Sequence, residues 1–199
     1  MPLRIGLTGG LASGKSTVGR WLAAAGFLVV DADRLVAGLY APGQPGAAAV
    51  AELFGPDLLD ANGAVLRPRL AKRIFANDAD RKRLENRIHP LVRERFASLA
   101  ARNRRPAVLE ATLLVEAGYA PDFDRIVTVE ASPELRLQRA IARGLSEAEA
   151  HARLLAQGSG DSRRVAAQVV LSNDGDLAAL RDQVDVLVAE LRRRDPAEP

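Results

Sequence analysis

Residues 7–22 read LTGGLASGKSTVGRWL and contain a spacing at which these residue types could do chemistry. Gly9, four further residues, Gly14, Lys15 and Ser16 match the pattern G-x-x-x-x-G-K-[ST]. Glycines adopt backbone angles that other residues avoid, so successive N–H groups can turn inward around an anion. Lys15 can then reach the β- and γ-phosphates of ATP, and the Ser16 hydroxyl can bind Mg²⁺.

The segments on either side of this loop have the types that a phosphate cradle requires. Residues 3–8 form a short apolar run typical of a strand, and Val18, Trp21 and Leu22 follow at helical spacing. A chance match in an ordinary strand-to-helix turn is the alternative, and these flanks argue against it. The predicted nucleotide contacts are Gly9, Gly10, Leu11, Ala12, Ser13, Gly14, Lys15, Ser16 and Thr17.

The composition limits the possible partners of the chain. Its 199 residues, 48% of them hydrophobic, suit one domain or one domain with an inserted lobe. We expect a cytoplasmic protein with no membrane partner, since no apolar run reaches transmembrane length and no signal-peptide pattern precedes the first strand. The formal charge of +3 and the 4% aromatic content argue against nucleic acid, and the absence of cysteine excludes thiol chemistry.

Five Val/Ile/Leu-rich runs alternate with helical segments, which is typical of an α/β fold with a parallel sheet. The interval between the second and third runs is too long for one crossover helix. We therefore predict a core over residues 1–34 and 106–199 and an inserted helical lobe over 35–105. The predicted strands are residues 3–8, 27–33, 106–112, 124–131 and 167–173.

Within the lobe, Asn77-Asp78 predicts a break between helices, and Pro90 a further helix start or a kink. His89-Pro90 is interpreted as a structural turn rather than a catalytic pair.

Residues 131–157 predict two helices joined by a tight turn. Ser132 is the expected cap of the first helix, Gly144 its end, and Ser146 with Glu149 a capping box for the second. This pair predicts a helical lid at about residues 143–158.

Three arginines share one face of the first of these helices. Arg136, Arg139 and Arg143 fall at i, i+3 and i+7. A solvated face is one interpretation; the other is a set of cations that closes over nucleotide phosphates. Arg143 lies nearest the turn and could swing farthest.

Two carboxylates, Asp31 and Asp33, end the second predicted strand, at the sheet edge where the phosphate loop also begins. Asp33 could accept a hydroxyl proton, or could cap a helix that begins at Arg34. Asp31 could bind Mg²⁺ through water or serve only the turn. Glu110 and Glu116 flank the exit of the third strand and could bind metal or substrate.

Across nearly the whole chain, the motifs resemble the dephospho-coenzyme A kinase family. The matching blocks, in the family's order, are GLTGGLASGKSTV, DADRLV, RPRLAKRIFAN, IHPLV, LLVE, SPELRLQRAIAR and LLAQ. The chain departs from the family pattern at Thr112, where a proline is usual, and at Gln168, where an aspartate is usual.

The resemblance implies transfer of the γ-phosphate of ATP to the 3′-hydroxyl of dephospho-CoA. It implies Asp33 as the base, Lys15 on the phosphates, Arg143 as the lid arginine, and a helical lobe that binds the CoA substrate. The predicted site also includes Arg139 for the nucleotide, and Ser16 and, through water, Asp31 for Mg²⁺. A monomer or weak homo-oligomer is expected.

Three rival functions remain open at this point. Another small-molecule P-loop kinase would act on a nucleotide or a polyol, although the long insert favours a larger acceptor. An NTP-hydrolysing switch is a second rival, but the chain has no Asn-Lys-x-Asp motif and no tandem-acid run after a strand. A non-catalytic ATP-binding module is the third, against which Asp33 argues.

Overall fold

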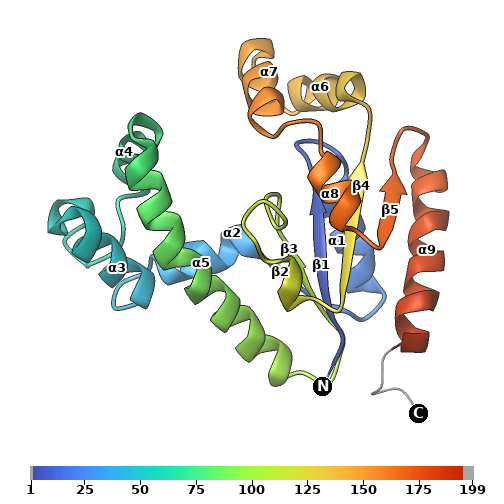
Figure 1. Ribbon diagram of the computed structural model, residues 1–199, viewed down its shortest axis with the longest axis horizontal. Helices are drawn as coiled ribbons and strands as arrows, with labels where there is room; N and C mark the ends of the chain where they lie inside the picture. The colour runs from blue at the N-terminus through green and yellow to red at the C-terminus, as the bar shows by residue number, and fades with distance from the viewer. Residues whose placement is uncertain (1, 195–199) are drawn as a thin grey trace. The chain divides into compact units, whose positions relative to one another are not determined.

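A five-stranded parallel sheet forms the centre of the fold, and its strand order is β2-β3-β1-β4-β5 (Figure 1). The computed structural model describes residues 2–194. The predicted α/β fold class is confirmed. The strands are β1 (Arg4–Gly9), β2 (Leu28–Asp31), β3 (Ala107–Glu110), β4 (Arg125–Glu130) and β5 (Val169–Ser172).

The chain divides into two compact units, Met1–Val30 with Ala100–Pro199, and Asp31–Leu99. From the sequence we placed the inserted lobe at 35–105, a few residues later at each end. The second unit begins with the last residue of β2. Its elements are α2 (Ala32–Leu39), α3 (Pro45–Phe54), η1 (Pro56–Leu58), α4 (Arg67–Ala76) and most of α5 (Asp78–Ala101).

In the first unit, helices pack on the sheet and bury its strands. α1 (Lys15–Ala24) lies against β1, β3 and β4, and α9 (Leu177–Arg194) lies against α1 and β5 (Figure 1). Their apolar faces and the strands form one core that includes Leu7, Val18 and Leu187. The remaining elements of this unit are η2 (Ala120–Asp122), α6 (Pro133–Ala142), α7 (Glu147–Ala156) and α8 (Asp161–Ala166).

In the second unit, a buried carboxylate joins two helices. Asp80 of α5 is 7% exposed and accepts hydrogen bonds from Arg73 of α4 at 2.8 Å and from Arg83 at 3.3 Å. Both guanidinium groups also lie over the Phe54 ring at the end of α3. These contacts hold three helices of the lobe together.

The turn that we predicted at His89-Pro90 is wrong, because α5 continues through Pro90 from Asp78 to Ala101. The break before Asp78 is present, since α4 ends at Ala76. A proline removes one backbone hydrogen bond from a helix. Burial along one face outweighs that loss: the buried residues recur every four positions on both sides of Pro90, at Leu84, Ile88, Val92, Phe96 and Ala100.

Among residues 2–194, no helix combines the length and apolar character that crossing a membrane requires.

Leu187→Ala should destabilise the sheet unit by about 2–5 kcal/mol, because it leaves a cavity in the core. Leu187 is 2% exposed and packs between α9 and the sheet. Leu177→Ala, on the same helix but 63% exposed, is the matched control and should change stability by no more than about 0.5 kcal/mol. Urea unfolding measures both; equal losses would contradict this assignment of the core.

Candidate active site

The loop between β1 and α1 presents a helix N-terminus without a side-chain cap. Gly14 is the N-cap of α1, and no side chain hydrogen-bonds to this helix end. Gly14 has φ of 105°, and an added Cβ would lie 2.3 Å from Nδ2 of Asn173, so no other residue fits there. An uncapped helix N-terminus attracts anions through its free N–H groups and its dipole.

The carboxylate of Glu110, the last residue of β3, binds the two polar side chains at the start of α1. Its Oε1 accepts hydrogen bonds from Lys15 Nζ at 2.8 Å and from Ser16 Oγ at 2.6 Å. The Lys15 and Glu110 side chains are only 14% and 9% exposed. The two residues predicted to bind phosphate and Mg²⁺ are therefore held side by side. Sequence reasoning gave Glu110 only as a general candidate for metal or substrate.

Asn173 supports the loop from the end of β5. The Asn173 Nδ2 donates to the Ser13 carbonyl oxygen at 2.7 Å. The backbone carbonyl oxygen of Asn173 accepts from Arg139 Nη2 at 3.0 Å. Within residues 2–194, three polar atoms of this group are buried without a hydrogen-bond partner: Ser13 Oγ, Asn173 Oδ1 and Arg139 Nη1. Sequence reasoning missed Asn173, and no local pattern marks it.

The three arginines of α6 differ in their surroundings. Arg136 is buried, and its Nε donates to the Leu11 carbonyl oxygen at 3.0 Å. Arg139 is half-buried and reaches Asn173, whereas Arg143 is exposed at the C-cap of α6. Burial lowers the pKa of the Arg136 guanidinium, and the nearby charge of Arg163 lowers it further. The arginine that contacts the phosphate loop is thus Arg136, which the sequence did not single out.

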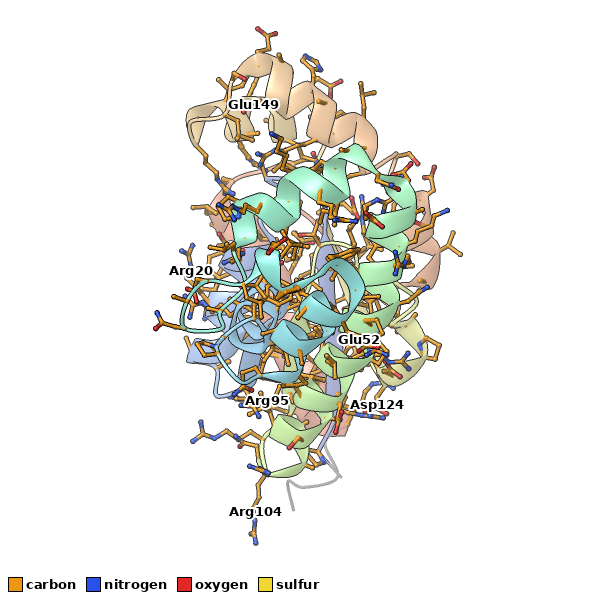
Figure 2. All side chains as sticks on the ribbon, turned by 90° about the vertical axis from the view of Figure 1, so that its left-hand side faces the viewer. Arg20, Glu52, Arg95, Arg104, Asp124 and Glu149 are labelled. Carbon is orange, nitrogen blue, oxygen red and sulfur yellow. The ribbon has the colours of Figure 1, made fainter. Side chains whose placement is uncertain are left out.

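The tight turn between α6 and α7 has the predicted caps. The Ser132 hydroxyl accepts from the Leu135 N–H, Arg143 is the C-cap, and Gly144 follows with φ of 95°. Ser146 and Glu149 form the capping box of α7, the helix in which Figure 2 labels Glu149.

At the second strand, Asp31 and Asp33 separate into different roles. We predicted that the strand includes both, but β2 ends at Asp31 and Asp33 lies in the first turn of α2. The cap of this helix is Asp31, whose Oδ1 accepts from the N–H groups of Asp33 and Arg34, so the interpretation of Asp33 as the cap is wrong. The Asp33 carboxylate is exposed, and in the described part of the chain no group hydrogen-bonds to it.

Glu116 belongs to a buried ion network. It accepts from Nη1 of Arg163 at 2.7 Å, and the Arg163 side chain, which is fully buried, also contacts Glu130 at the end of β4. Gln168, where the family usually has an aspartate, accepts from the Ile126 N–H at 2.7 Å. Through this hydrogen bond, the Gln168 side chain binds the backbone of β4.

The oxygens near the loop suit a hard cation that also binds phosphate. Mg²⁺ prefers oxygen ligands and is usually bound by only one or two protein carboxylates. Oxygens of phosphate and water complete its coordination shell. Ser16 Oγ and Glu110 Oε1 lie 2.6 Å apart and supply a hydroxyl and a carboxylate. In residues 2–194 no three His, Asp or Glu side chains gather into a metal cage. Ser16 and Glu110 thus provide two oxygen donors of the kind that Mg²⁺ prefers.

A sequence model of dephospho-CoA kinase matches residues 3–179 of this chain. The chain belongs to the dephospho-CoA kinase family. It is 40% identical to the dephospho-CoA kinase of Corynebacterium efficiens and 42% identical to that of Streptomyces avermitilis. The two alignments cover 96% and 98% of this chain and 98% of each relative.

Solved structures share this fold over nearly the whole length. TT1252 from Thermus thermophilus superposes with a TM-score of 0.81 at 35% identity, covering 96% of this chain and 98% of the other. The dephospho-CoA kinase from Campylobacter jejuni has a TM-score of 0.73 at 24% identity, covering 98% and 99%, and shows the fold. The phosphate loop and its supports therefore lie in a kinase fold.

Glu110→Ala should lower the free energy of unfolding by about 3 kcal/mol, since it leaves the mostly buried Lys15 ammonium without its carboxylate. Glu190→Ala removes a carboxylate from a surface pair with Arg194 and should cost at most about 1 kcal/mol. Urea unfolding without nucleotide checks both variants. Losses of the same size would show that the Glu110 contacts add nothing beyond a surface pair.

Proposed function

We propose that this protein transfers the γ-phosphate of ATP to the 3′-hydroxyl of dephospho-CoA, the final step of coenzyme A synthesis. The observation that carries the proposal is the family match over residues 3–179. The phosphate loop, with Lys15 and Ser16 at the uncapped start of α1, agrees with it. A cytoplasmic location, and a monomer or weak homo-oligomer, belong to the same proposal.

Lys15 and the loop amides, over Gly9–Thr17, would bind the nucleotide phosphates. When bound, ATP supplies the phosphoryl group, and Mg²⁺ neutralises part of its charge. Phosphoryl transfer depends mainly on positioning and on charge stabilisation. Glu110 holds Lys15 beside Ser16 at the start of α1, where the phosphates would bind. Ser16, with Asp31 acting through water, is proposed for the metal.

Asp33 is the proposed base for the acceptor hydroxyl. Its carboxylate is exposed and does not cap α2, so both oxygens can accept a hydrogen bond from substrate. It would orient the hydroxyl and take up its proton at a carboxylate oxygen as the new O–P bond forms and the bond from the γ-phosphorus to the bridging oxygen breaks, which releases ADP. Asp31, which caps the helix, fixes the start of α2 and with it the backbone that carries Asp33.

The lobe over 35–105 is proposed as the binding region for the CoA substrate.

Residues 143–158 are proposed as a lid. A cavity of about 470 Å³ lies between α6 and α7, and Leu137, Leu154 and Leu155 are among the residues that line it. The exposed Arg143 at the turn has the freedom that a lid arginine requires, and Arg139 would contact the nucleotide.

The assay that tests the function supplies purified protein with ATP, Mg²⁺ and one acceptor at a time. We expect CoA and ADP in equal amounts from dephospho-CoA, and no comparable turnover with a nucleotide, shikimate or gluconate. Mass spectrometry of the acceptor locates the new phosphate. Efficient turnover of another acceptor without CoA formation would reject the proposal in favour of a different small-molecule kinase.

Asp33→Asn should lower kcat by about 10²-fold or more, because the amide keeps the size of the side chain but cannot take a proton. ATP affinity and the melting temperature should change little, since Asp33 caps nothing. Asp182→Asn, at an exposed aspartate of α9 that has no role in the proposed site, is the matched control and should keep wild-type activity. Steady-state kinetics of both variants decide, and wild-type kcat in Asp33→Asn would disprove the base.

A further inference from the structure

The peptide groups of Leu11, at the top of the phosphate loop, are bound on both sides by side chains from the helical pair. The Leu11 N–H donates to Gln157 Oε1 at 2.7 Å, and the Leu11 carbonyl oxygen accepts from Arg136 Nε at 3.0 Å. Arg136 Nη2 also donates to the same Gln157 Oε1 at 3.1 Å. Leu11, Arg136 and Gln157 thus form a closed ring of three hydrogen bonds, here called the Leu11 clamp.

The sequence of the loop leaves room for this clamp. A Cβ added to Gly10 would lie 2.2 Å from Arg136 Nη2 and 2.6 Å from its Cζ, so any side chain there would displace the guanidinium. Ala12, on the other side of Leu11, has φ of 55° and is the one non-glycine residue of the described chain with positive φ. A left-handed alanine is strained and persists only where its neighbours are held. The Leu11 clamp holds Leu11, the residue before Ala12.

Gln157 is itself fixed from the opposite side. It is the C-cap of α7, and its backbone carbonyl oxygen accepts from Arg163 Nη1 at 3.5 Å. Arg163 is completely buried and ion-paired to Glu116 and Glu130. The end of α7 is therefore anchored both to the phosphate loop and to the core at the end of β4.

The geometry points to Arg136 and Gln157 as positioning residues that hold the phosphate loop in its anion-binding conformation. Gln157 fixes the Leu11 N–H, and Arg136 fixes the Leu11 carbonyl while adding a buried positive charge beside the loop. Among residues 2–194 no carboxylate hydrogen-bonds to Arg136, and although the charge of Glu130 stabilises it, the charges of Arg163 and Arg164 oppose it, so a bound anion would stabilise it further. Anchoring at Gln157 also makes the C-terminal end of α7 the fixed end of the proposed lid. The effect on turnover rests on the proposed function, whereas the effect on the loop does not.

Gln157→Leu removes the hydrogen-bond acceptor at nearly constant size, and Gln157→Glu keeps an acceptor for both donors. Gln138→Leu is the matched control, because Gln138 is exposed on α6. Hydrogen exchange of residues 7–14 is measured without nucleotide, together with calorimetric ATP affinity and KM and kcat. We expect Gln157→Leu to speed exchange and weaken ATP binding by about tenfold, as for a buried N–H left without a partner. Gln138→Leu should stay near wild type. Gln157→Glu should keep the slow exchange of the loop but weaken ATP binding, because its carboxylate adds negative charge beside the loop and balances the charge of Arg136.

Wild-type exchange and ATP affinity in a folded Gln157→Leu would overturn the proposal, as would an equal effect in Gln138→Leu. Circular dichroism and the melting temperature verify folding. If Gln157→Leu does not fold, Gln157→Asn, which is one methylene too short to reach Leu11, takes its place with the same expectations. Should the protein fail to phosphorylate dephospho-CoA, the exchange and affinity measurements still decide on the clamp.

Arg136→Met separates positioning from simple stabilisation. Since the variant removes a buried cation that has no hydrogen-bonded carboxylate, the melting temperature should hold or rise. Exchange of residues 7–14 should nevertheless speed up, and ATP binding should weaken. A lower melting temperature with unchanged loop exchange would show that Arg136 is only a packing residue.

Discussion

The contacts of Glu110 with Lys15 and Ser16 are the constraint around which the nucleotide-binding unit is arranged. A phosphate loop gathers positive charge from a lysine, a helix dipole and inward N–H groups, and this gathering is unfavourable without a nearby anion. The carboxylate at the end of β3 supplies that anion within the chain. It can lie there because residue 19 is glycine: a Cβ would come within 2.6 Å of Glu110 Oε2. Glu110 thereby joins the end of β3 to the start of α1, beside the strand β1 with which β3 pairs.

The elements that position this contact could be predicted from local sequence. Apolar runs of strand length, glycines at the loop and the caps at Ser132 and Ser146 each act within a few residues, and all are present in the structure. The supports of the loop could not be predicted, because they join distant segments. Asn173 binds Ser13, and Gln157 binds Leu11, across more than a hundred residues of chain. Nothing in the sequence around Asn173 or Gln157 indicates that its side chain binds so distant a residue.

The errors of sequence interpretation have a common cause in competition between local rules. A period of two extended the second strand to Asp33, but Asp31 offers its carboxylate to two N–H groups and so starts a helix two residues earlier. A proline predicted a turn at residue 90, but burial of one face on both sides of it preserves α5. In both places, a second local interaction outweighed the rule that was applied.

Arginine side chains join the helical pair to the phosphate loop and to the core. Of the 28 basic residues only three are lysines, and the one in the loop is the compact charge that fits between phosphates. The planar guanidinium instead offers several donors in fixed directions, so Arg136 binds a carbonyl and an amide oxygen together. Arg163 likewise joins Glu116, Glu130 and the backbone of Gln157. A lysine has one donor centre and could not span these partners, so the anchoring of α7 depends on arginine at both positions.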